Sequence, residues 1–310
     1  MSVNTAELLA IHPEVVDALA TGRAVVALES TITTHGLPRP DNLEAARMSE
    51  AAIREAGAVP ATVAVHDGHL LVGLSDDELV ELADARDIPK VSRQNLAGVL
   101  ARPGWGGTTV AGTMIAAHLA GIRVFATGGI GGVHRGGESS MDISADLGEL
   151  GRTPVTVVCA GPKSILDIGR TLEALETRGV PVVGYGSDEV AGFYSRTSGH
   201  RAPLRVDTPE EAAALIDNQR SLGLEGGVLI TQPLPPEIAL PADEVAAAVD
   251  QAEAELQAQG IHGPASTPFV LARVAELTEG RSVVANLEII RRDAALAGRI
   301  AVALAERAAN

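Results

Sequence analysis

Short runs of uninterrupted apolar residues recur along this chain and alternate with longer amphipathic stretches. Apolar runs of this length are typical of strands that are covered on both faces. When such strands alternate with helices, they form a mostly parallel sheet between two helical layers. The pattern therefore predicts an α/β fold, a three-layer α/β/α arrangement. The apolar runs are residues 24–28, 123–127, 155–159, 180–183 and 227–230.

The amphipathic stretches predict the helices, and one further section predicts a different kind of strand pairing. Residues 61–74 contain two apolar segments joined at Asp67-Gly68, a dipeptide suited to a tight hairpin turn. An antiparallel hairpin is therefore expected beside the parallel sheet. Ser75, with Glu78 three positions later, predicts a capped helix start. The expected helices are residues 42–56, 107–120, 163–178, 208–221, 242–259, 265–277 and 281–307.

The 310 residues show no internal repeat and no long linker, so a single domain over residues 1–310 is expected. The 40 acidic and 24 basic residues give a net charge of −16, which disfavours a nucleic-acid partner. A lone cysteine, Cys159, fits a reducing compartment. No signal-peptide pattern or long apolar stretch is present, so we expect a soluble cytoplasmic protein without a membrane partner.

Only two lysines, Lys90 and Lys163, occur among the 24 basic residues, so the other 22 are arginine. Arginine stays protonated in proteins, whereas a lysine amine can lose its proton and act as a nucleophile. Lys163 follows the apolar run 155–159 and a Gly161-Pro162 turn, and we expect it at a helix N-terminus. The positive end of the helix dipole would there favour the neutral amine. The alternative is a solvated surface lysine.

Other polar residues also follow predicted strands, where ligands of parallel sheets bind. Glu29 ends the first apolar run and could act as a general acid, or it could cap a turn. Lys90, with Arg93 nearby, could bind an anion or be an ordinary loop cation. The loops expected at this edge of the sheet are residues 29–31, 128–140, 161–163, 184–186 and 231–233.

A glycine-rich segment, residues 128–137, could bring backbone N–H groups close to an anion. It matches neither the dinucleotide-binding nor the P-loop spacing, so no nucleotide cofactor is indicated. The same segment carries His134 and Arg135, which could equally belong to an exposed flexible loop.

Two carboxylates follow, Asp142 and Asp146, spaced to share a face if the segment is helical. Oxygen ligands with waters suit Mg²⁺ or Mn²⁺, although acids at a helix N-terminus are the simpler explanation. Asn286 lies on an apolar helix, and on position alone a satisfied core amide is favoured over a ligand contact. An amide could also bind a base edge or a sugar hydroxyl.

Several long motifs in order make the sequence recognisable. The chain resembles the pseudouridine-5′-phosphate glycosidase family, which also includes proteins called indigoidine synthase A, from about Pro13 to Ala305. The resemblance implies reversible cleavage of pseudouridine 5′-phosphate to uracil and ribose 5-phosphate, one Mn²⁺ per subunit, an α/β/α fold and a homotrimer. The motifs that carry it are residues 27–32, 89–92, 126–135, 140–147, 160–167 and 284–286.

The resemblance also implies roles for individual residues. Lys163 corresponds to the nucleophile and Glu29 to the proton donor. Asp142 corresponds to the metal ligand, with Mg²⁺ or another divalent ion as an alternative to Mn²⁺. His134 and Asn286 correspond to residues that handle the base and the opened sugar. The substrate contacts correspond to Lys90, Val110, Ser144, Ala145 and Asp146.

A carbon–carbon glycosidic bond gives a reason for the lysine. The hypothesis is that the ribose ring opens, Lys163 attacks C1′ and an iminium forms as uracil C5 is protonated and leaves. Glu29 would move protons with His134 assisting, and the metal would hold the phosphate or hydroxyls through waters. Two alternatives remain: a Schiff-base aldolase or lyase on another sugar phosphate, and a non-catalytic sugar-phosphate-binding protein.

Overall fold

The structure, a computed structural model, describes residues 5–37, 39–261 and 266–309. A mixed sheet of 11 strands forms its centre, with a main path in the order β1-β4-β3-β2-β7-β9-β13-β11-β12. The strands of the sheet are β1 Leu9–Ile11, β2 Val25–Leu28, β3 Val59–His66, β4 His69–Val72, β5 Lys90–Val91, β6 Trp105–Thr108, β7 Val124–Ala126, β9 Thr156–Cys159, β11 Val182–Tyr185, β12 Leu204–Val206 and β13 Leu229–Thr231.

From β3 to β12 every neighbouring pair on the main path is parallel, as the apolar runs predicted. The pairing of β3 with β4 is antiparallel and turns at Asp67-Gly68, so the predicted hairpin is confirmed. Asp67 and Gly68 both have positive φ, which a tight turn of this kind requires. The predicted capping box is also present: Ser75 and Glu78 bond each other's backbone N–H groups.

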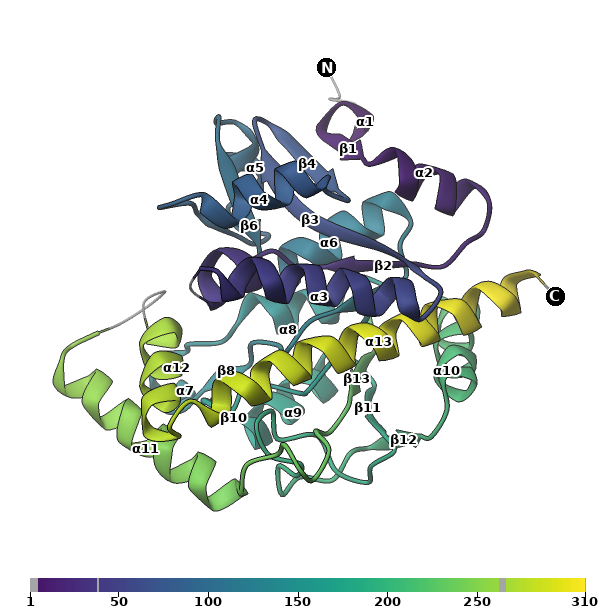
Figure 1. The fold of residues 1–310 in the computed structure, drawn as a ribbon. Coiled ribbons are helices and arrows are strands. Elements are labelled where there is room, and N and C mark those ends of the chain that lie inside the picture. The colour runs from purple at the N-terminus through teal and green to yellow at the C-terminus, as the bar shows by residue number, and fades with distance from the viewer. Residues whose placement is uncertain (1–4, 38, 262–265, 310) are drawn as a thin grey trace.

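Helices cover both faces of the sheet, which confirms the three-layer α/β/α prediction (Figure 1). The helical segments are α1 Thr5–Leu8, α2 Pro13–Ala20, η1 Ile32–Gly36 (a π-helical turn), α3 Asp41–Glu55, α4 Asp76–Asp84, α5 Leu96–Leu100, α6 Val110–Ala120, α7 Gly137–Ser140, α8 Ala145–Leu150, α9 Ile168–Thr177, α10 Pro209–Ser221, α11 Ala242–Ala258, α12 Ser266–Leu277 and α13 Arg281–Ala309. No helix within the described residues combines the length and the apolar character needed to cross a membrane.

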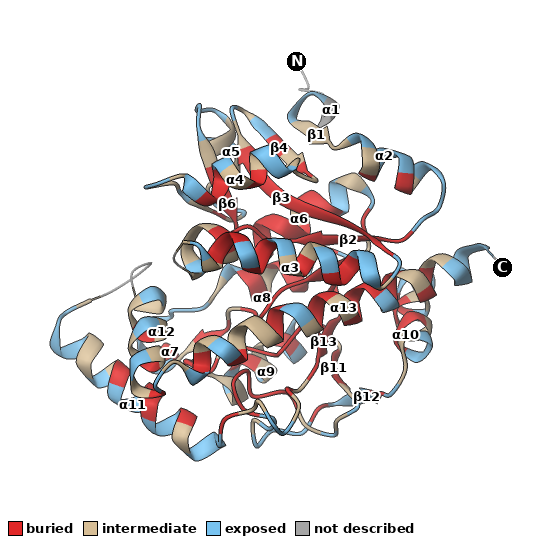
Figure 2. Ribbon diagram, viewed as in Figure 1, coloured by how far each residue is buried: buried red, intermediate tan, exposed pale blue. Residues whose placement is uncertain are grey.

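The apolar core lies between these layers, and the central strands are buried along their length (Figure 2). One cluster packs α2, α6, α8 and α9 against one face of the sheet. A second packs α3, α10 and α13 against the other face. A third cluster lies apart from the sheet, where α11 and α12 form a helical pair beside the start of α13 (Figure 1). This helical pair covers one end of the strands and is important for the site.

Two expectations about helix positions were wrong. Lys163 does not start a helix, because residues 164–165 form a turn and α9 begins only at Ile168, capped by Asp167. The intervening strand β10 (Leu166–Asp167) pairs with β8 (Val133–His134) of the glycine-rich segment. Asp142 and Asp146 do not share a helix either, since α8 starts at Ala145 after its cap, Ser144. The arguments from the helix dipole and from helical spacing therefore do not apply.

Candidate active site

The carboxyl ends of β2, β7 and β9 open into a cavity of about 440 Å³. Strand ends supply one side of it, as the rule for parallel sheets predicts. The loops after β11 and β13 at residues 184–186 and 231–233, also expected here, do not line it. All ten residues singled out in the sequence do line it: Glu29, Lys90, Val110, His134, Asp142, Ser144, Ala145, Asp146, Lys163 and Asn286.

Glu29 is buried on the cavity's strand-end side, with 7% of its surface exposed. The hydroxyl of Thr31 donates to one carboxylate oxygen and the hydroxyl of Thr127 donates to the other. Burial raises the pKa of Glu29, and the positive charge of Lys163 together with the two hydroxyls offsets only part of that rise. A carboxyl group with a raised pKa beside a cavity is suited to donate a proton.

Both lysines line the cavity, and the charge of each interacts with this carboxyl group. Lys163 follows β9 in a turn that is held by a hydrogen bond from its backbone N–H to the carbonyl of Ile130, 3.1 Å long. Lys90 begins β5 and is half-buried. Burial lowers the pKa of Lys90, the charge of Lys163 lowers it further, and Glu29 acts in the opposite direction. An anionic ligand between the lysines would relieve this repulsion.

Asp146 holds the strand-end segments together. Its carboxylate accepts the backbone N–H of Ala111 at 3.1 Å and that of Gly131 at 2.8 Å. These bonds join α8 to the start of α6 and to the glycine-rich segment. A Cβ at Gly131 would collide with Ser144 and approach Asp146, so only glycine allows this contact. The segment is thus a fixed part of the site rather than a flexible loop.

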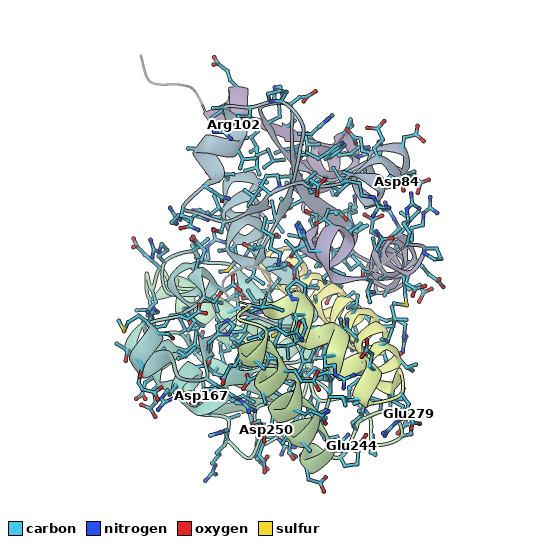
Figure 3. All side chains as sticks on the ribbon, turned by 90° about the vertical axis from the view of Figure 1, so that its left-hand side faces the viewer. Asp84, Arg102, Asp167, Glu244, Asp250 and Glu279 are labelled. Carbon is cyan, nitrogen blue, oxygen red and sulfur yellow. The ribbon has the colours of Figure 1, made fainter. Side chains whose placement is uncertain are left out.

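His134 and Arg135 leave the glycine-rich segment in different directions. His134 lies in β8, lines the cavity and is half-buried. Arg135 forms ion pairs with Asp250 and Glu253 on α11, and Figure 3 shows Asp250 at the surface of that helix. The pairs connect the segment to the helical pair α11–α12 on the outside of the cavity.

Asp142 lies in the loop before α8, where its side chain is exposed and lines the cavity. Its backbone is held by Ser140 and His134, but its carboxylate oxygens accept no hydrogen bond from the described residues. A free carboxylate of this kind, completed by waters and substrate oxygens, fits the coordination that Mg²⁺ and Mn²⁺ prefer. The described residues contain no cluster of three or more protein ligands for a metal. Asp146 is the poorer candidate, because both its oxygens already bind backbone N–H groups.

Sequence reasoning missed the other side of the cavity. It is formed by residues of α12, by the loop after β11 and by residues 165–166 at the start of β10, together with Asn286 of α13. No described residue bonds the amide of Asn286, so the satisfied core amide is not what the structure shows. Burial of an apolar surface links these residues, and apart from Ile165 and Leu166, which lie in the motif at residues 160–167, no motif contains them. They are Ile165, Leu166, Phe193, Tyr194, Thr267, Pro268 and Leu271.

His35 was also missed, although it lies only three residues after the first motif, residues 27–32. Its ring nitrogens contact the hydroxyl of Thr34 at 2.7 Å and the carbonyl of Ile88 at 3.2 Å, two residues before Lys90. Burial lowers the pKa of His35, and the charge of Lys90 lowers it further. His35 therefore braces the segment that presents Lys90 to the cavity.

The fold and the site define an α/β enzyme whose cavity holds a buried carboxyl group and two lysines for a small anionic substrate. The chain belongs to the family of indigoidine synthase A-like proteins, whose sequence profile matches residues 14–303.

Curated relatives are similar over nearly their whole length. A protein of Paracoccus denitrificans named pseudouridine-5′-phosphate glycosidase is 56% identical over 300 residues, which is 96% of this chain and 99% of the relative. A protein of the same name from Methylobacterium nodulans is 56% identical over 297 residues, which is 96% of this chain and 88% of the relative.

Two solved structures share the fold. The prealnumycin C-glycosynthase AlnA, in complex with ribulose 5-phosphate, is 40% identical with a TM-score of 0.91, covering 98% of this chain and 99% of that one. An indigoidine synthase A-like protein of Thermotoga maritima is 34% identical with a TM-score of 0.87, covering 96% of this chain and 97% of that one.

Proposed function

We propose that this protein reversibly cleaves the carbon–carbon glycosidic bond of pseudouridine 5′-phosphate, giving uracil and ribose 5-phosphate. The observation that carries the proposal is the meeting of Lys163, Glu29 and Lys90 in one cavity. The chain is also more than half identical to proteins named for this reaction. A structural neighbour named as a C-glycosynthase holds a pentose phosphate.

The two sides of the cavity suggest how the substrate lies. Lys90 offers positive charge and Val110, at the N-terminus of α6, offers a backbone N–H group, which together favour the phosphate. The side near α12 is apolar and aromatic, which favours a planar base. Since Lys163 and Glu29 line the same cavity, we place C1′ of the ribose, which joins the sugar to the base, next to them.

Lys163 acts first in this mechanism. Its neutral Nζ bonds to C1′ as the bond from C1′ to the ring oxygen breaks, and that oxygen takes the proton that the nitrogen loses, so the nitrogen keeps a lone pair. Uracil C5 then takes a proton and the C1′–C5 bond breaks. Its electron pair returns to the base, while the nitrogen lone pair forms the iminium. Water hydrolyses the iminium to ribose 5-phosphate, which restores the lysine.

Glu29 is the proton donor in this scheme. Its raised pKa leaves a proton available, and the hydroxyls of Thr31 and Thr127 orient its carboxyl group. His134 assists from the facing strand β8. Asn286 binds the base or the opened sugar, and Asp146 positions the backbone of residues 110–111 and 131 around the substrate.

Mn²⁺, or another divalent ion, would be held by Asp142 with waters, and through those waters it would hold the phosphate or the sugar hydroxyls. A homotrimer, which rests on the family resemblance, and a cytoplasmic location, which rests on the lone cysteine and the missing signal-peptide pattern, complete the proposal. Gel filtration with light scattering measures the first. Removal of divalent ions with EDTA should reduce turnover, and added Mn²⁺ should restore it. Turnover that persists in EDTA contradicts the metal assignment.

The test is a turnover assay with pseudouridine 5′-phosphate and Mn²⁺, followed by mass spectrometry after borohydride. Uracil release with a pentose-phosphate adduct on Lys163 supports both the reaction and the iminium. Uracil release without an adduct supports the reaction and leaves the covalent step to be tested with variants of Lys163. Absence of uracil with metal present overturns the reaction and favours another sugar phosphate as substrate.

A further inference from the structure

Tyr194 is buried in the helical side of the cavity, and the mechanism above does not use it. Only 3% of its surface is exposed. Its ring belongs to the apolar cluster of α11, α12 and α13, and it also lines the cavity. The carbonyl of Tyr194 accepts a hydrogen bond from Leu240, 2.9 Å long, so its backbone is fixed.

The preceding residue holds the tyrosine in position. Phe193 has a φ of 64°, a left-handed conformation that costs energy for a residue with a bulky side chain. Its N–H donates to the carbonyl of Ala160, 3.1 Å away. Its ring meets the ring of Tyr194 edge-on, with centroids 4.6 Å apart and an interplanar angle of 63°. Surroundings that maintain such a conformation leave Tyr194 little freedom.

The hydroxyl of Tyr194 has no hydrogen-bond partner among the described residues. A buried tyrosine hydroxyl usually finds a partner, because an unpaired one costs free energy. The hydroxyl oxygen of Tyr194 is not among the side-chain atoms that are both fully shielded from solvent and without a partner, so it keeps access to some open space. The open space that this residue adjoins is the cavity. Burial also raises the pKa of Tyr194, so the group remains a protonated donor.

A pyrimidine base bound here would supply the missing acceptor. In a base joined through C5, two carbonyl oxygens and two N–H groups remain free. The amide of Asn286 can pair with one carbonyl and an adjacent N–H group. The second carbonyl then needs a donor within an otherwise apolar wall.

We propose that the hydroxyl of Tyr194 donates a hydrogen bond to a carbonyl oxygen of the base, which makes Tyr194 a specificity-determining residue. This inference rests on the proposed function, because it assumes that the base lies between Asn286 and the aromatic pair. A site built to bond a carbonyl rejects a base that lacks it, since the hydroxyl is then left unpaired.

Tyr194→Phe removes the hydroxyl and keeps the ring, so the apolar cluster stays packed. The chain offers a matched control, since Tyr185→Phe changes the only other tyrosine, which lies outside the cavity. The assay runs in the direction of synthesis, with uracil, 2-thiouracil or 4-thiouracil and ribose 5-phosphate. Borohydride trapping with ribose 5-phosphate alone measures formation of the iminium at Lys163 in the absence of any base.

For Tyr194→Phe we expect the KM for uracil to rise about tenfold, the size of one neutral hydrogen bond. Trapping of ribose 5-phosphate and the properties of Tyr185→Phe should stay unchanged. Sulfur is a weak acceptor, so the wild type should disfavour both thiouracils, one through the bond to Asn286 and the other through the bond to Tyr194. Tyr194→Phe should lose the preference at one position and keep it at the other, which identifies the carbonyl that Tyr194 binds.

An unchanged KM for uracil in Tyr194→Phe overturns the inference, and so does a loss confined to ribose 5-phosphate trapping. A wild type with equal preference for uracil and both thiouracils also overturns it, and that result requires no variant. Failure of the wild type to join uracil to ribose 5-phosphate is a different outcome, because it contradicts the proposed function itself.

Discussion

The cavity has two walls that are built in different ways. In the strand-end wall, acids and backbone groups are bonded to one another before any substrate arrives, as at Glu29 and Asp146. In the helical wall, apolar side chains pack closely while the polar tips of Tyr194 and Asn286 have no partner among the described residues. The strand-end wall consists of Glu29, Lys90, Val110, Asp146 and Lys163, and the helical wall consists of Phe193, Tyr194, Thr267, Leu271 and Asn286.

This difference in hydrogen bonding indicates that the strand-end wall carries out the chemistry and that the helical wall recognises the base. Groups that must move protons or form bonds gain from being held in place, because their geometry then costs nothing at the moment of reaction. Polar groups left unpaired in an apolar wall gain most when a ligand satisfies them. Changes in the strand-end wall should therefore reduce turnover, and changes in the helical wall should alter which base is bound.

The largest effect is expected at Lys163. Lys163→Ala should abolish uracil release, and Lys163→Arg should do the same, because a guanidinium does not supply a neutral nucleophile. The melting temperature should stay close to that of the wild type, since the side chain is only partly buried. Near-normal turnover in either variant would falsify the covalent role and with it the catalytic character of the strand-end wall.

The second-largest effect on turnover is expected for Asp146→Asn. An asparagine offers one acceptor oxygen, so the N–H of Ala111 or of Gly131 would face an amide N–H. We expect a stability loss of about 2 kcal/mol, as for a charged hydrogen bond, and a fall in kcat of about a hundredfold, typical for lost preorganisation. Urea unfolding and steady-state kinetics measure the two.

Asp142→Asn is the matched control, because no described residue bonds the Asp142 carboxylate and its removal should leave stability unchanged. Equal destabilisation by Asp142→Asn and Asp146→Asn would show that Asp146 does not organise the wall.

Glu29→Gln should change how stability depends on pH. The pKa of Glu29 is raised by burial in the folded state, so folding costs free energy above the folded pKa, and this cost disappears below the unfolded pKa. Stability from this group therefore falls as pH rises. The variant should melt higher than the wild type at pH 8, and the two should converge towards pH 4. A melting-temperature difference that is constant across this range would contradict the raised pKa.

Leu271→Ala should produce the smallest effect. It opens space in the helical wall without touching a reacting atom, so the KM for uracil should rise about threefold, the effect of losing part of an apolar contact, with kcat nearly unchanged. Leu119→Ala, at an exposed position on α6 outside the cavity, serves as the control. A fall in kcat as large as that of Asp146→Asn would remove the distinction between the two walls.

The two walls also differ in how well the sequence predicts them. Glu29, the glycine-rich segment and Lys163 each follow an apolar strand, and parallel strands bring such ends together. The fold class and the hairpin at Asp67-Gly68 were predictable for the same reason, since periodicity and turn chemistry are local. Motif resemblance then added Val110 and Asn286, which no local rule selects.

The helical wall could not be predicted in this way. Phe193 and Leu271 are ordinary apolar residues, and they meet only because α12 folds back over strand ends far away in the sequence. The helix start at Lys163 was wrong because residues 166–167 pair with β8 before α9 begins, so a tertiary contact overrides a plausible local start. A strand of only two residues is too short to show the alternating pattern by which strands are predicted.

The pairing of β8 with β10 has a consequence for engineering. The segment with His134 and the segment after Lys163 form one structural unit, because their backbones pair with Leu166 opposite His134. A slip of one residue would turn His134 towards the opposite face. Libraries that vary only one segment would therefore disturb the other, so a transplant into a related scaffold should move residues 128–137 and 160–167 together as a cassette.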